Sequence, residues 1–400
     1  MSYALERGGP QARPGLPRAV LEQVRSHKAE ILAHLRRLCL LETPTDVPES
    51  QEEAHAVLSD VLHDLGYRVR MIRGRGCGRH LLAAPSERPH GHPIQLLVGH
   101  TDTVWPLGTL EEMPVKIQDG RLFGPGAFDM KSGVVLILFA LKVVAELGLE
   151  PPATPVVFIN SDEETGSPDS RRHVRRLARC ARRAFVLEPS LGVEGKLKTA
   201  RKGVGHFDVT IRGKAAHAGL DPASGASAIL ELSHVIQSLH SLNDEASGIT
   251  VNVGVIDGGI RPNVVAPVAS AGVDVRIANV QDGERIERLI HGLQPSVPGV
   301  SLQVRGGIKI PPLERTPRNR RLWEAARAAG ADLGLSLDEA MAGGGSDGNT
   351  TSLYTATLDG LGAVGDGAHA EHEHVDIDGT VDRCALLALL LLAPLDDKVG

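Results

Sequence analysis

Residues 94–102 read IQLLVGHTD, a short apolar run that ends in a histidine and an acid. A run of this length, preceded by the Pro/His/Gly turn at 88–93, is typical of a strand buried on both faces. The same pattern recurs at 155–160 and 184–187, and a helical pattern over 131–147 stands between the first two runs. Strands that alternate with helices predict an α/β layer with a mostly parallel sheet.

A different pattern begins near residue 200. Strands that alternate apolar and polar residues are interrupted by two helical patterns, in the order β-α-β-β-α-β of a small α+β sandwich. The strands are expected at 206–211, 249–253, 271–276 and 300–304, and the helices at 223–242 and 282–293. Pro311 and Pro312 mark the exit from this segment. We therefore expect a domain of residues 200–310, inserted into a discontinuous α/β domain of residues 1–199 and 311–400.

Composition argues against several classes of protein. The chain of 400 residues carries 43 Lys and Arg against 49 Asp and Glu, a net charge of −6, whereas a nucleic-acid binder normally has a basic excess. The Arg-rich stretch at 171–176 is interpreted as a solvated helix face. The cysteines are widely spaced and form no CxxC pair, which favours free thiols in a reducing compartment. They are Cys39, Cys77, Cys180 and Cys384.

The sequence offers no membrane span. Its longest apolar run, residues 385–393, is far below the roughly 20 residues that a bilayer requires. Residues 1–18 contain charges and prolines but no apolar core of a secretory signal. Helical patterns at 18–42 and 49–65 and a strand pattern at 67–72 follow directly. We expect a cytoplasmic protein.

The residues that suggest chemistry are acids and histidines placed at strand ends or helix starts. They are His100, Asp102, Asp129, Glu163, Glu164, Glu188 and His369. Each has an ordinary alternative interpretation, such as a surface pair, a helix N-cap, a solvated acidic loop or a polar turn. Ligands of open α/β sheets bind outside the carboxyl ends of the strands, where these residues are expected. Together they supply the mixed nitrogen and oxygen donors that zinc accepts. They are numerous enough to bind two metal ions bridged by a carboxylate.

Several motifs, taken in order, resemble the glutamate carboxypeptidase and aminoacylase family of dizinc hydrolases. They are GHTDTV (99–104), GPGAFDMKSG (124–133), SDEETGS (161–167), LEPS (187–190), GKAAHAG (213–219), RPNVV (261–265), GGGSDG (343–348) and GDGAHAEHEHV (365–375). The similarity runs from about residue 20 to 395. It implies a dizinc-exopeptidase catalytic domain, with helices on both faces of its sheet, and an inserted ferredoxin-like lid that also dimerises.

The resemblance also implies roles for the residues at the strand ends. His100 and Glu188 match the terminal ligands of one zinc ion, and Glu164 and His369 match those of the other. Asp129 matches the bridging carboxylate, with a cis peptide bond to Met130. Asp102 matches the carboxylate that orients His100, and Glu163 matches the general base. Cobalt or manganese are possible substitutes for zinc.

Four further roles fall in the inserted domain. His217 matches the histidine that reaches the active site of the partner subunit and stabilises the developing oxyanion, so a homodimer is implied. Asn263 and Arg276 match lid residues that contact the substrate. Relatives often have a basic residue just before the proline that leaves the lid, but here Ile310 stands there. Lys309 is displaced by one residue, which leaves a preference for a glutamate side chain open.

The motif GPG (124–126), the stretch TVWPLGTL (103–110) and the choice of Glu188 rather than Asp lie closest to the bacterial glutamate carboxypeptidase branch. The resemblance thus implies a zinc hydrolase that cleaves the amide bond to a C-terminal amino acid with a free carboxylate. One alternative is an N-acyl amino acid deacylase or desuccinylase. A remote alternative is a non-catalytic binding protein on the same scaffold. The implied partner is a peptide or N-acyl amino acid, with no nucleic acid and no membrane.

Overall fold

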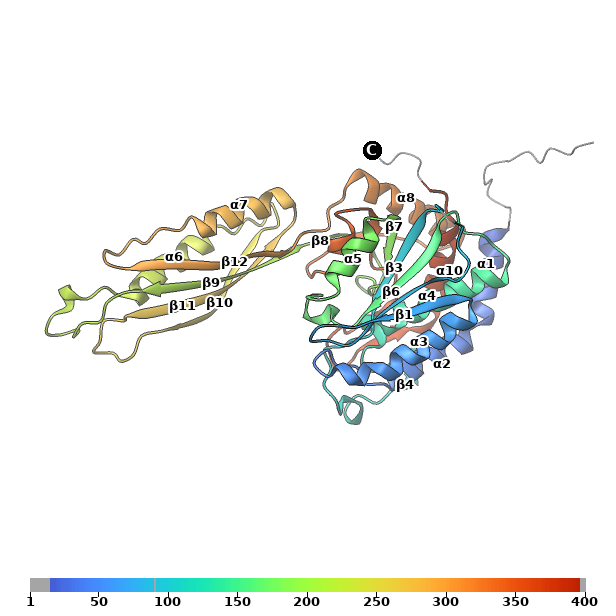
Figure 1. The fold of residues 1–400 in the computed structure, drawn as a ribbon, viewed down its shortest axis with the longest axis horizontal. Coiled ribbons are helices and arrows are strands. Elements are labelled where there is room, and N and C mark those ends of the chain that lie inside the picture. Colours follow the sequence, from blue (N-terminus) through green and yellow to red (C-terminus); the bar gives the residue numbers. More distant parts are fainter. Residues whose placement is uncertain (1–14, 90, 396–400) are drawn as a thin grey trace, which may run out of the picture. The chain divides into compact units, whose positions relative to one another are not determined.

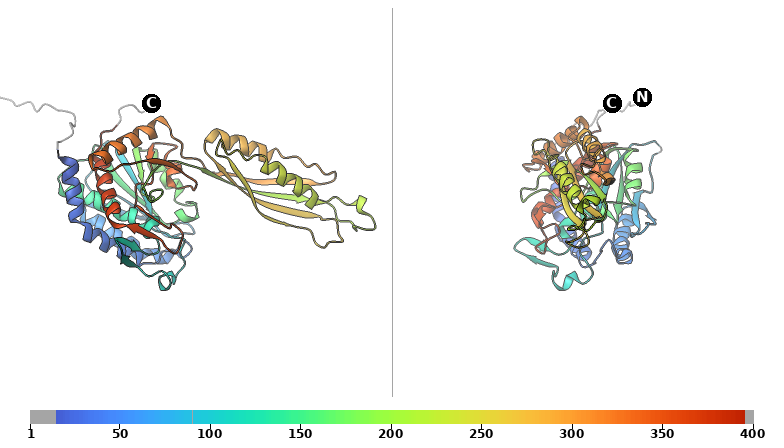
Figure 2. Two further views of the ribbon diagram at one scale, coloured as in Figure 1. Left: turned by 180° about the vertical axis from the view of Figure 1, so that it is seen from behind. Right: turned by 90° about the vertical axis from the view of Figure 1, so that its left-hand side faces the viewer.

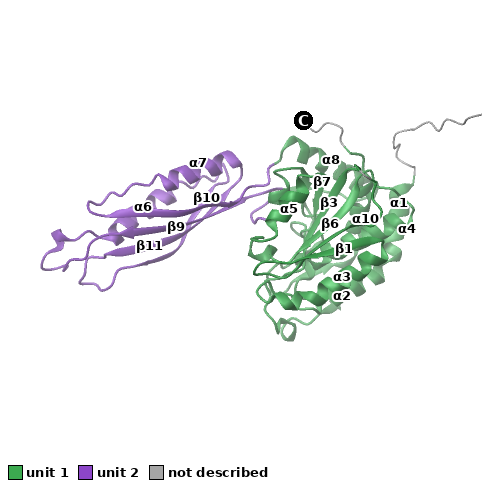
Figure 3. Ribbon diagram, in the orientation of Figure 1, with its two compact units in different colours: residues 1–199, 315–340, 346–400 green, residues 200–314, 341–345 purple. Residues whose placement is uncertain are grey.

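The structure is a computed structural model that describes residues 15–89 and 91–395. The chain forms two compact units, coloured separately in Figure 3. Unit 1 contains residues 1–199, 315–340 and 346–400, and unit 2 contains residues 200–314 and 341–345. Unit 2 therefore includes residues 311–314 and 341–345, which lie outside the insertion limits expected from the sequence.

Unit 1 is built on a six-stranded mixed sheet, seen in Figure 1. Its order is β1 (Tyr67–Ile72), β2 (His80–Pro85), β6 (Thr154–Asn160), β3 (Ile94–His100), β7 (Ala181–Val186) and β14 (Ala356–Leu358). Neighbours from β6 to β14 pair in parallel, whereas β1 and β2 join the sheet antiparallel. The expected α/β class with a mostly parallel sheet is confirmed.

The central strands β3 and β6 are buried along their whole length, so both faces of the sheet carry apolar side chains. Leu97 and Val157 belong to a large core on one face, together with the long apolar helices of unit 1. Leu96 and Phe158 point the other way, into a smaller core that includes residues of α5 (Arg171–Ala178). This alternation follows from the period of two in a strand.

The helices on the large-core face are α1 (Leu16–Ser26), α2 (Lys28–Cys39), α3 (Glu52–Asp64), α4 (Ser132–Glu146), α8 (Pro317–Asp332) and α10 (Ile377–Leu392). A single helix was expected over residues 18–42, but the structure has two, because the helix is interrupted at His27. The His27 ring lies 2.7 Å from Glu146 at the end of α4 and 3.0 Å from Glu30. No helix within 15–89 and 91–395 combines the length and apolarity needed to cross a bilayer.

Short elements complete unit 1. They are α9 (Asp347–Thr351), β4 (Lys116–Gln118), β5 (Arg121–Phe123), β8 (Leu197–Arg201), β13 (Glu339–Ala342), β15 (Gly365–Asp366), β16 (His374–Asp376) and the turns η1 (Pro48–Gln51), η2 (Thr109–Glu111), η3 (Ala127–Lys131) and η4 (Glu163–Thr165). Of these, β8 and β13 pair with each other, and the boundary between the two units falls within each of these strands. Strands β15, β16, β5 and β4 form a separate small sheet.

Unit 2 is a four-stranded antiparallel sheet of order β10-β11-β9-β12, with two helices. Its elements are β9 (Gly203–Arg212), η5 (Pro222–Ser224), α6 (Ala228–His240), β10 (Thr250–Gly258), β11 (Val268–Ile277), α7 (Val280–His291) and β12 (Ser301–Ile310). The two helices cover the same face of the sheet, as both views in Figure 2 show. Buried residues such as Phe207, Leu232 and Ile286 form its own core. The order and pairing are those of a ferredoxin-like fold, as expected.

Candidate metal centre

The candidate site of unit 1 begins at the end of β3, where His100 is 1% exposed and Asp102 is fully buried. The Nδ1 atom of His100 lies 2.9 Å from the backbone oxygen of Asp102 and 3.4 Å from its carboxylate. Two acceptors beside Nδ1 place the proton of a neutral ring there and leave Nε2 with a lone pair. The Nε2 atom is buried without a hydrogen-bond partner. It is therefore oriented as a metal ligand would be.

Asp129 lies between two histidines that are far apart in the sequence. Its Oδ1 atom is 3.4 Å from Nε2 of His100, and its Oδ2 atom is 3.4 Å from Nε2 of His369. The Asp129–Met130 peptide bond is cis, as expected. One carboxylate that faces a different nitrogen donor with each oxygen has the geometry of a bridging ligand.

The remaining carboxylates surround these three residues. Glu164 Oε2 lies 3.1 Å from Nε2 of His369, while Glu188 Oε1 and Glu163 Oε2 lie 3.7 and 4.0 Å from Nε2 of His100. Two overlapping groups have ligand atoms within 4.8 Å of one another: His100, Asp129 and Glu164, and His100, Glu163 and Glu188. The structure thus brings together all seven residues that the sequence singled out in this domain.

The electrostatics of the cluster show an excess of carboxylates. Burial raises the pKa of Glu163 well above its usual range and that of Glu164 to about 7. Hydrogen bonds to Asp129 and Glu164 raise the pKa of His369 to about 10. In the metal-free protein, protons therefore neutralise part of the cluster, and divalent cations would displace them. The orphaned polar atoms and the mixed nitrogen and oxygen donors fit divalent metal.

Asp102 has a second task that the sequence did not reveal. Its carboxylate accepts backbone N–H groups from Glu163 and Glu164 at 3.2 and 3.1 Å, and the hydroxyl of Thr45 at 2.8 Å. One buried acid therefore holds both the His100 ring and the turn that carries the paired glutamates.

Sequence reasoning also left Glu373 without a role. Its Oε1 atom accepts the N–H groups of Phe128 and Asp129, and its Oε2 atom accepts those of Gly126 and the Trp105 ring, all at 2.8 to 3.0 Å. Gly126 has a φ of 72°, and a Cβ there would lie 2.7 Å from Thr103. Glu373 and this glycine set the turn that presents Asp129. In the sequence, nothing around Glu373 distinguishes it from the neighbouring residues Ala370 and Glu371 of the same loop.

Two more residues of the neighbourhood were missed. Asp347 is buried, accepts hydrogen bonds from Asn160 and Ser167, and has its pKa raised to about 7 by burial. Lys198 lines a cavity of about 370 Å³ together with Asp129 and Ser190. Asp347 begins the short helix α9 and Lys198 lies in strand β8, and neither has a local sequence pattern that marks it as a site residue. Only the motif GGGSDG, which contains Asp347, could have suggested the first.

The predicted residues of unit 2 are placed as follows. His217 and Asn263 are exposed, and their loops are joined by a hydrogen bond from the N–H of Ala218 to the oxygen of Asn263. Arg276 already binds Asp274 on the same strand, at 2.8 and 3.1 Å. Lys309 is exposed and lies where the register of β12 against β9 shifts by one residue.

Comparison with known proteins identifies the family. The model of "Peptidase family M20/M25/M40" matches residues 96–393. Carboxypeptidase G2 of Pseudomonas sp. (strain RS-16) is 29% identical over 372 residues, which cover 90% of this chain and 88% of the relative. Acetylornithine deacetylase of Myxococcus xanthus is 30% identical over 241 residues, which cover 56% of this chain and 61% of the relative.

A solved structure supports the fold. The YXEP protein of Bacillus subtilis, described as a dinuclear metal binding peptidase of the M20 family, has a TM-score of 0.69 at 14% identity. The match covers 92% of this chain and 98% of that one. The expected family and the expected metal-dependent hydrolase class are confirmed. The chain belongs to peptidase family M20/M25/M40 and is a metal-dependent hydrolase of the M20 type.

Proposed function

We propose that this hydrolase uses two zinc ions to release a C-terminal amino acid with a free carboxylate from a peptide or acyl group. The observation that carries the proposal is the position of Asp129, whose two oxygens face His100 and His369. Glu188 would complete the ligands of one ion with His100, and Glu164 those of the other with His369. Cobalt or manganese would be expected to substitute.

Two bound cations would polarise the scissile carbonyl and lower the pKa of the attacking water. Glu163 would take the proton of that water and deliver it to the leaving amine. Its Oε2 atom lies beside the cluster, 4.0 Å from Nε2 of His100, while its backbone is fixed by Asp102. Burial raises the pKa of the Glu163 carboxyl above its ordinary range, which makes the carboxylate a stronger base than an exposed glutamate.

His217 is proposed as the donor to the developing oxyanion. Its Nδ1 atom accepts the backbone N–H groups of Gly219 and Leu220, both at 3.1 Å. A neutral ring with Nδ1 as acceptor carries its proton on Nε2, which is then free to donate. Asn263 and Arg276 are proposed to contact the substrate. For Arg276, this requires that the guanidinium either break its hydrogen bonds to Asp274 or bind Asp274 and the substrate at the same time.

A homodimer is proposed because His217 belongs to the lid, which resembles the dimerisation domain of the family. Unit 2 offers a surface for such contact. Strand β10 is at the edge of its sheet, and Val255 and Ile256 on it are 69% and 62% exposed. Ile229 and Leu230 on α6 are about half exposed. Exposed apolar groups beside an unpaired strand edge are typical of protein interfaces.

A cytoplasmic location is also proposed. Its support is that all four cysteines are free thiols, as reducing compartments favour.

The function is tested by amine release from N-acyl amino acids and dipeptides, with zinc and with chelator. The C-terminal residue of the panel varies through Glu, Asp, Ala, Leu, Lys and Gly. Chelator-sensitive release of one C-terminal amino acid from dipeptides is the expected result. A preference for a C-terminal glutamate would support a role for Lys309 in binding the substrate side chain. The absence of such a preference would exclude that role.

A deacylase is the second candidate, favoured by the similarity to acetylornithine deacetylase over 56% of the chain. It predicts release from N-acetyl or N-succinyl amino acids and none from dipeptides. The same panel therefore separates the two candidates.

A further inference from the structure

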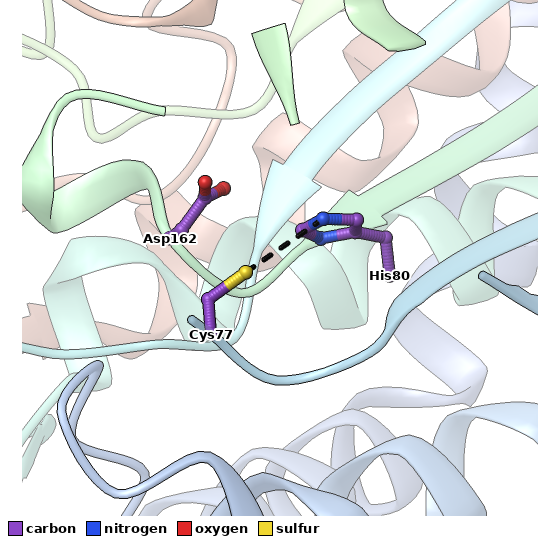
Figure 4. Close-up of side chains that lie close together, drawn as sticks. All are labelled: Cys77, His80 and Asp162. Carbon is purple, nitrogen blue, oxygen red and sulfur yellow. Dashed lines mark hydrogen bonds between the residues drawn. The ribbon is translucent and has the colours of Figure 1, made fainter. Parts of the chain in front are cut away.

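A second cluster of metal-ligating side chains lies in unit 1, apart from the residues assigned above. It consists of Cys77 in the loop between β1 and β2, His80 at the start of β2, and Asp162 just after β6. Figure 4 shows the three side chains close together, with the Cys77 sulfur facing the His80 ring. One ligand atom from each lies within 4.8 Å of the others.

We propose that Cys77, His80 and Asp162 form a third site for a divalent metal, with zinc as the ion that best suits the donors. Thiolate, imidazole and carboxylate are the three ligand types that zinc combines in proteins. Cys77 Sγ lies 3.9 Å from Nε2 of His80. Zinc bond lengths at a tetrahedral angle would place those two atoms about 3.5 Å apart, so only a small closure is needed.

The hydrogen bonds of His80 orient the ring for this role. Its Nδ1 atom lies 3.2 Å from the hydroxyl of Ser161, which itself donates to the oxygen of Arg79 at 2.5 Å. A hydroxyl has one proton to donate, so Nδ1 must be the donor to Ser161. A neutral ring then has its lone pair on Nε2, which faces Cys77 Sγ and lies 3.2 Å from Asp169 Oδ2. The lone pair of His80 Nε2 and the carboxylate of Asp169 repel each other unless a proton or a metal cation lies between them.

Asp162 supplies an independent observation. The residue is fully buried, and its Oδ2 atom accepts the backbone N–H groups of Asp169 and Ser170 at 2.8 and 3.2 Å. Its Oδ1 atom has no hydrogen-bond partner among the described residues. A buried carboxylate oxygen without a donor is costly, and a cation bound by the cluster would satisfy it. Asp169, only 7% exposed, is the nearest candidate for a fourth ligand.

The loop that carries Cys77 is shaped around the sulfur. A Cβ at Gly74 would lie 2.6 Å from Cys77 Sγ and 2.1 Å from the oxygen of Gly78, so glycine is required for this close approach. The N–H of Arg75 donates to Asp169 Oδ2 at 3.1 Å and fixes the loop against the cluster. The conformation of this loop therefore holds the Cys77 thiol beside the other proposed ligands.

The chemistry of binding is proton displacement. Burial raises the pKa of the Cys77 thiol to about 11, so in the absence of metal the sulfur is protonated and a poor nucleophile. Binding breaks the S–H bond, forms a sulfur–metal bond and releases one proton to solvent. No electron is transferred. The bound ion would join the β1–β2 loop to the segment that leads into Glu163 and Glu164.

The test is a cobalt titration of the metal-free full-length protein, followed in the near ultraviolet. Cobalt bound by a thiolate gives a charge-transfer band there, whereas the nitrogen and oxygen donors of the catalytic cluster do not. We expect the band in the wild type and its loss in Cys77→Ser. Cys180→Ser, at an exposed cysteine, should retain it. After zinc loading and dialysis, the wild type should hold one more zinc per chain than Cys77→Ser.

Absence of the band in the wild type, its persistence in Cys77→Ser, or its appearance only with a large excess of cobalt would overturn the proposal. Circular dichroism and thermal unfolding establish that each variant is folded. Because His80 is buried, His80→Gln is the second variant, and weaker cobalt binding with an intact fold is expected. Amine release from the same preparations shows separately whether the proposed hydrolysis holds.

Discussion

Glu373 accepts the backbone N–H of Asp129 at 3.0 Å, across 244 residues of sequence. The same carboxylate accepts three further donors around the 126–129 turn, so the position of the proposed bridging ligand depends on an acid that would not itself touch metal. Residues that orient metal ligands are commonly as important as the ligands.

Replacing Glu373 by Gln should weaken metal binding. The amide nitrogen would face two N–H donors in place of a carboxylate oxygen, and the turn would shift. Zinc affinity, measured by competition with a chromogenic chelator, is expected to fall by about 10- to 100-fold. Glu371→Gln, at an exposed acid of the same loop, is the control and should bind zinc normally. An unchanged affinity in Glu373→Gln would remove Glu373 from this role.

Glu163→Gln should abolish turnover and keep the metal. The amide cannot accept the proton of the attacking water, yet the other carboxylates and the histidines remain. Metal content by atomic spectroscopy and amine release on one sample provide the two readouts. If metal is lost with activity, Glu163 is a ligand, and the separation of base from ligand is wrong.

His217→Ala should lower kcat by about 10²- to 10³-fold without loss of metal, the effect of removing one oxyanion donor. His206→Ala replaces another exposed histidine of unit 2 and should have no such effect. A normal kcat in His217→Ala would exclude it from the mechanism.

If the site is shared between subunits, mixed inactive variants should complement each other. Glu163→Gln and His217→Ala subunits that exchange freely would regain roughly a quarter of the wild-type activity, because half of the dimers contain one intact site. Exchange is followed with subunits carrying different tags. Complete exchange without recovered activity would show that each subunit uses its own His217.

The dimer itself should depend on β10. Ile256→Asp places a charge on the exposed strand edge and is expected to give monomers in analytical ultracentrifugation. Val193→Asp changes a 70% exposed apolar residue of unit 1 and should leave the oligomer intact. A monomeric wild type, or a dimeric Ile256→Asp, would place the interface elsewhere or remove it.

His55 should make stability sensitive to acid. It is buried beside the hydroxyl of Thr101 at 3.0 Å, and burial lowers its pKa to about 4. The unfolded chain takes up this proton near pH 6.5 and the native protein only near pH 4, so the stabilisation is complete above pH 6.5 and is lost as pH falls between these values. The loss amounts to at most about 3 kcal/mol.

The experiment compares urea unfolding at pH 7.5 and pH 5 for wild type, His55→Gln and His63→Gln, all in chelator. His55→Gln should lose less stability on acidification than the wild type. His63, exposed on the same helix, should make no difference. Equal losses in all three proteins would contradict the assignment.

The parts of the fold that the sequence predicts are those with strong local patterns. The buried runs of β3 and β6 and the alternating strands β9 and β11 lie within a few residues of their expected limits, whereas β10 and β12 extend five and six residues further than expected. The break at His27 could not be predicted, because the apolar period continues across it and the partner, Glu146, is distant in sequence. Residues 254–258 of β10 were missed because that end of the edge strand is largely exposed.

The candidate site divides in the same way. Motifs at strand ends identify the seven residues that cluster around Asp129. Glu373 and Asp347 were missed because their partners, the 126–129 turn and Asn160 and Ser167, meet them only in the folded chain. The second task of Asp102 likewise depends on the turn at 163–164 lying against it.

The most direct test of the proposed dinuclear hydrolase is to remove metal and titrate zinc back while measuring amine release. Cys77→Ser is the suitable protein, because the proposed third site is absent from it. Activity should disappear with chelator and return to a plateau at two zinc ions per chain. Full activity in the metal-free protein, or a plateau at one zinc ion, would contradict the proposal.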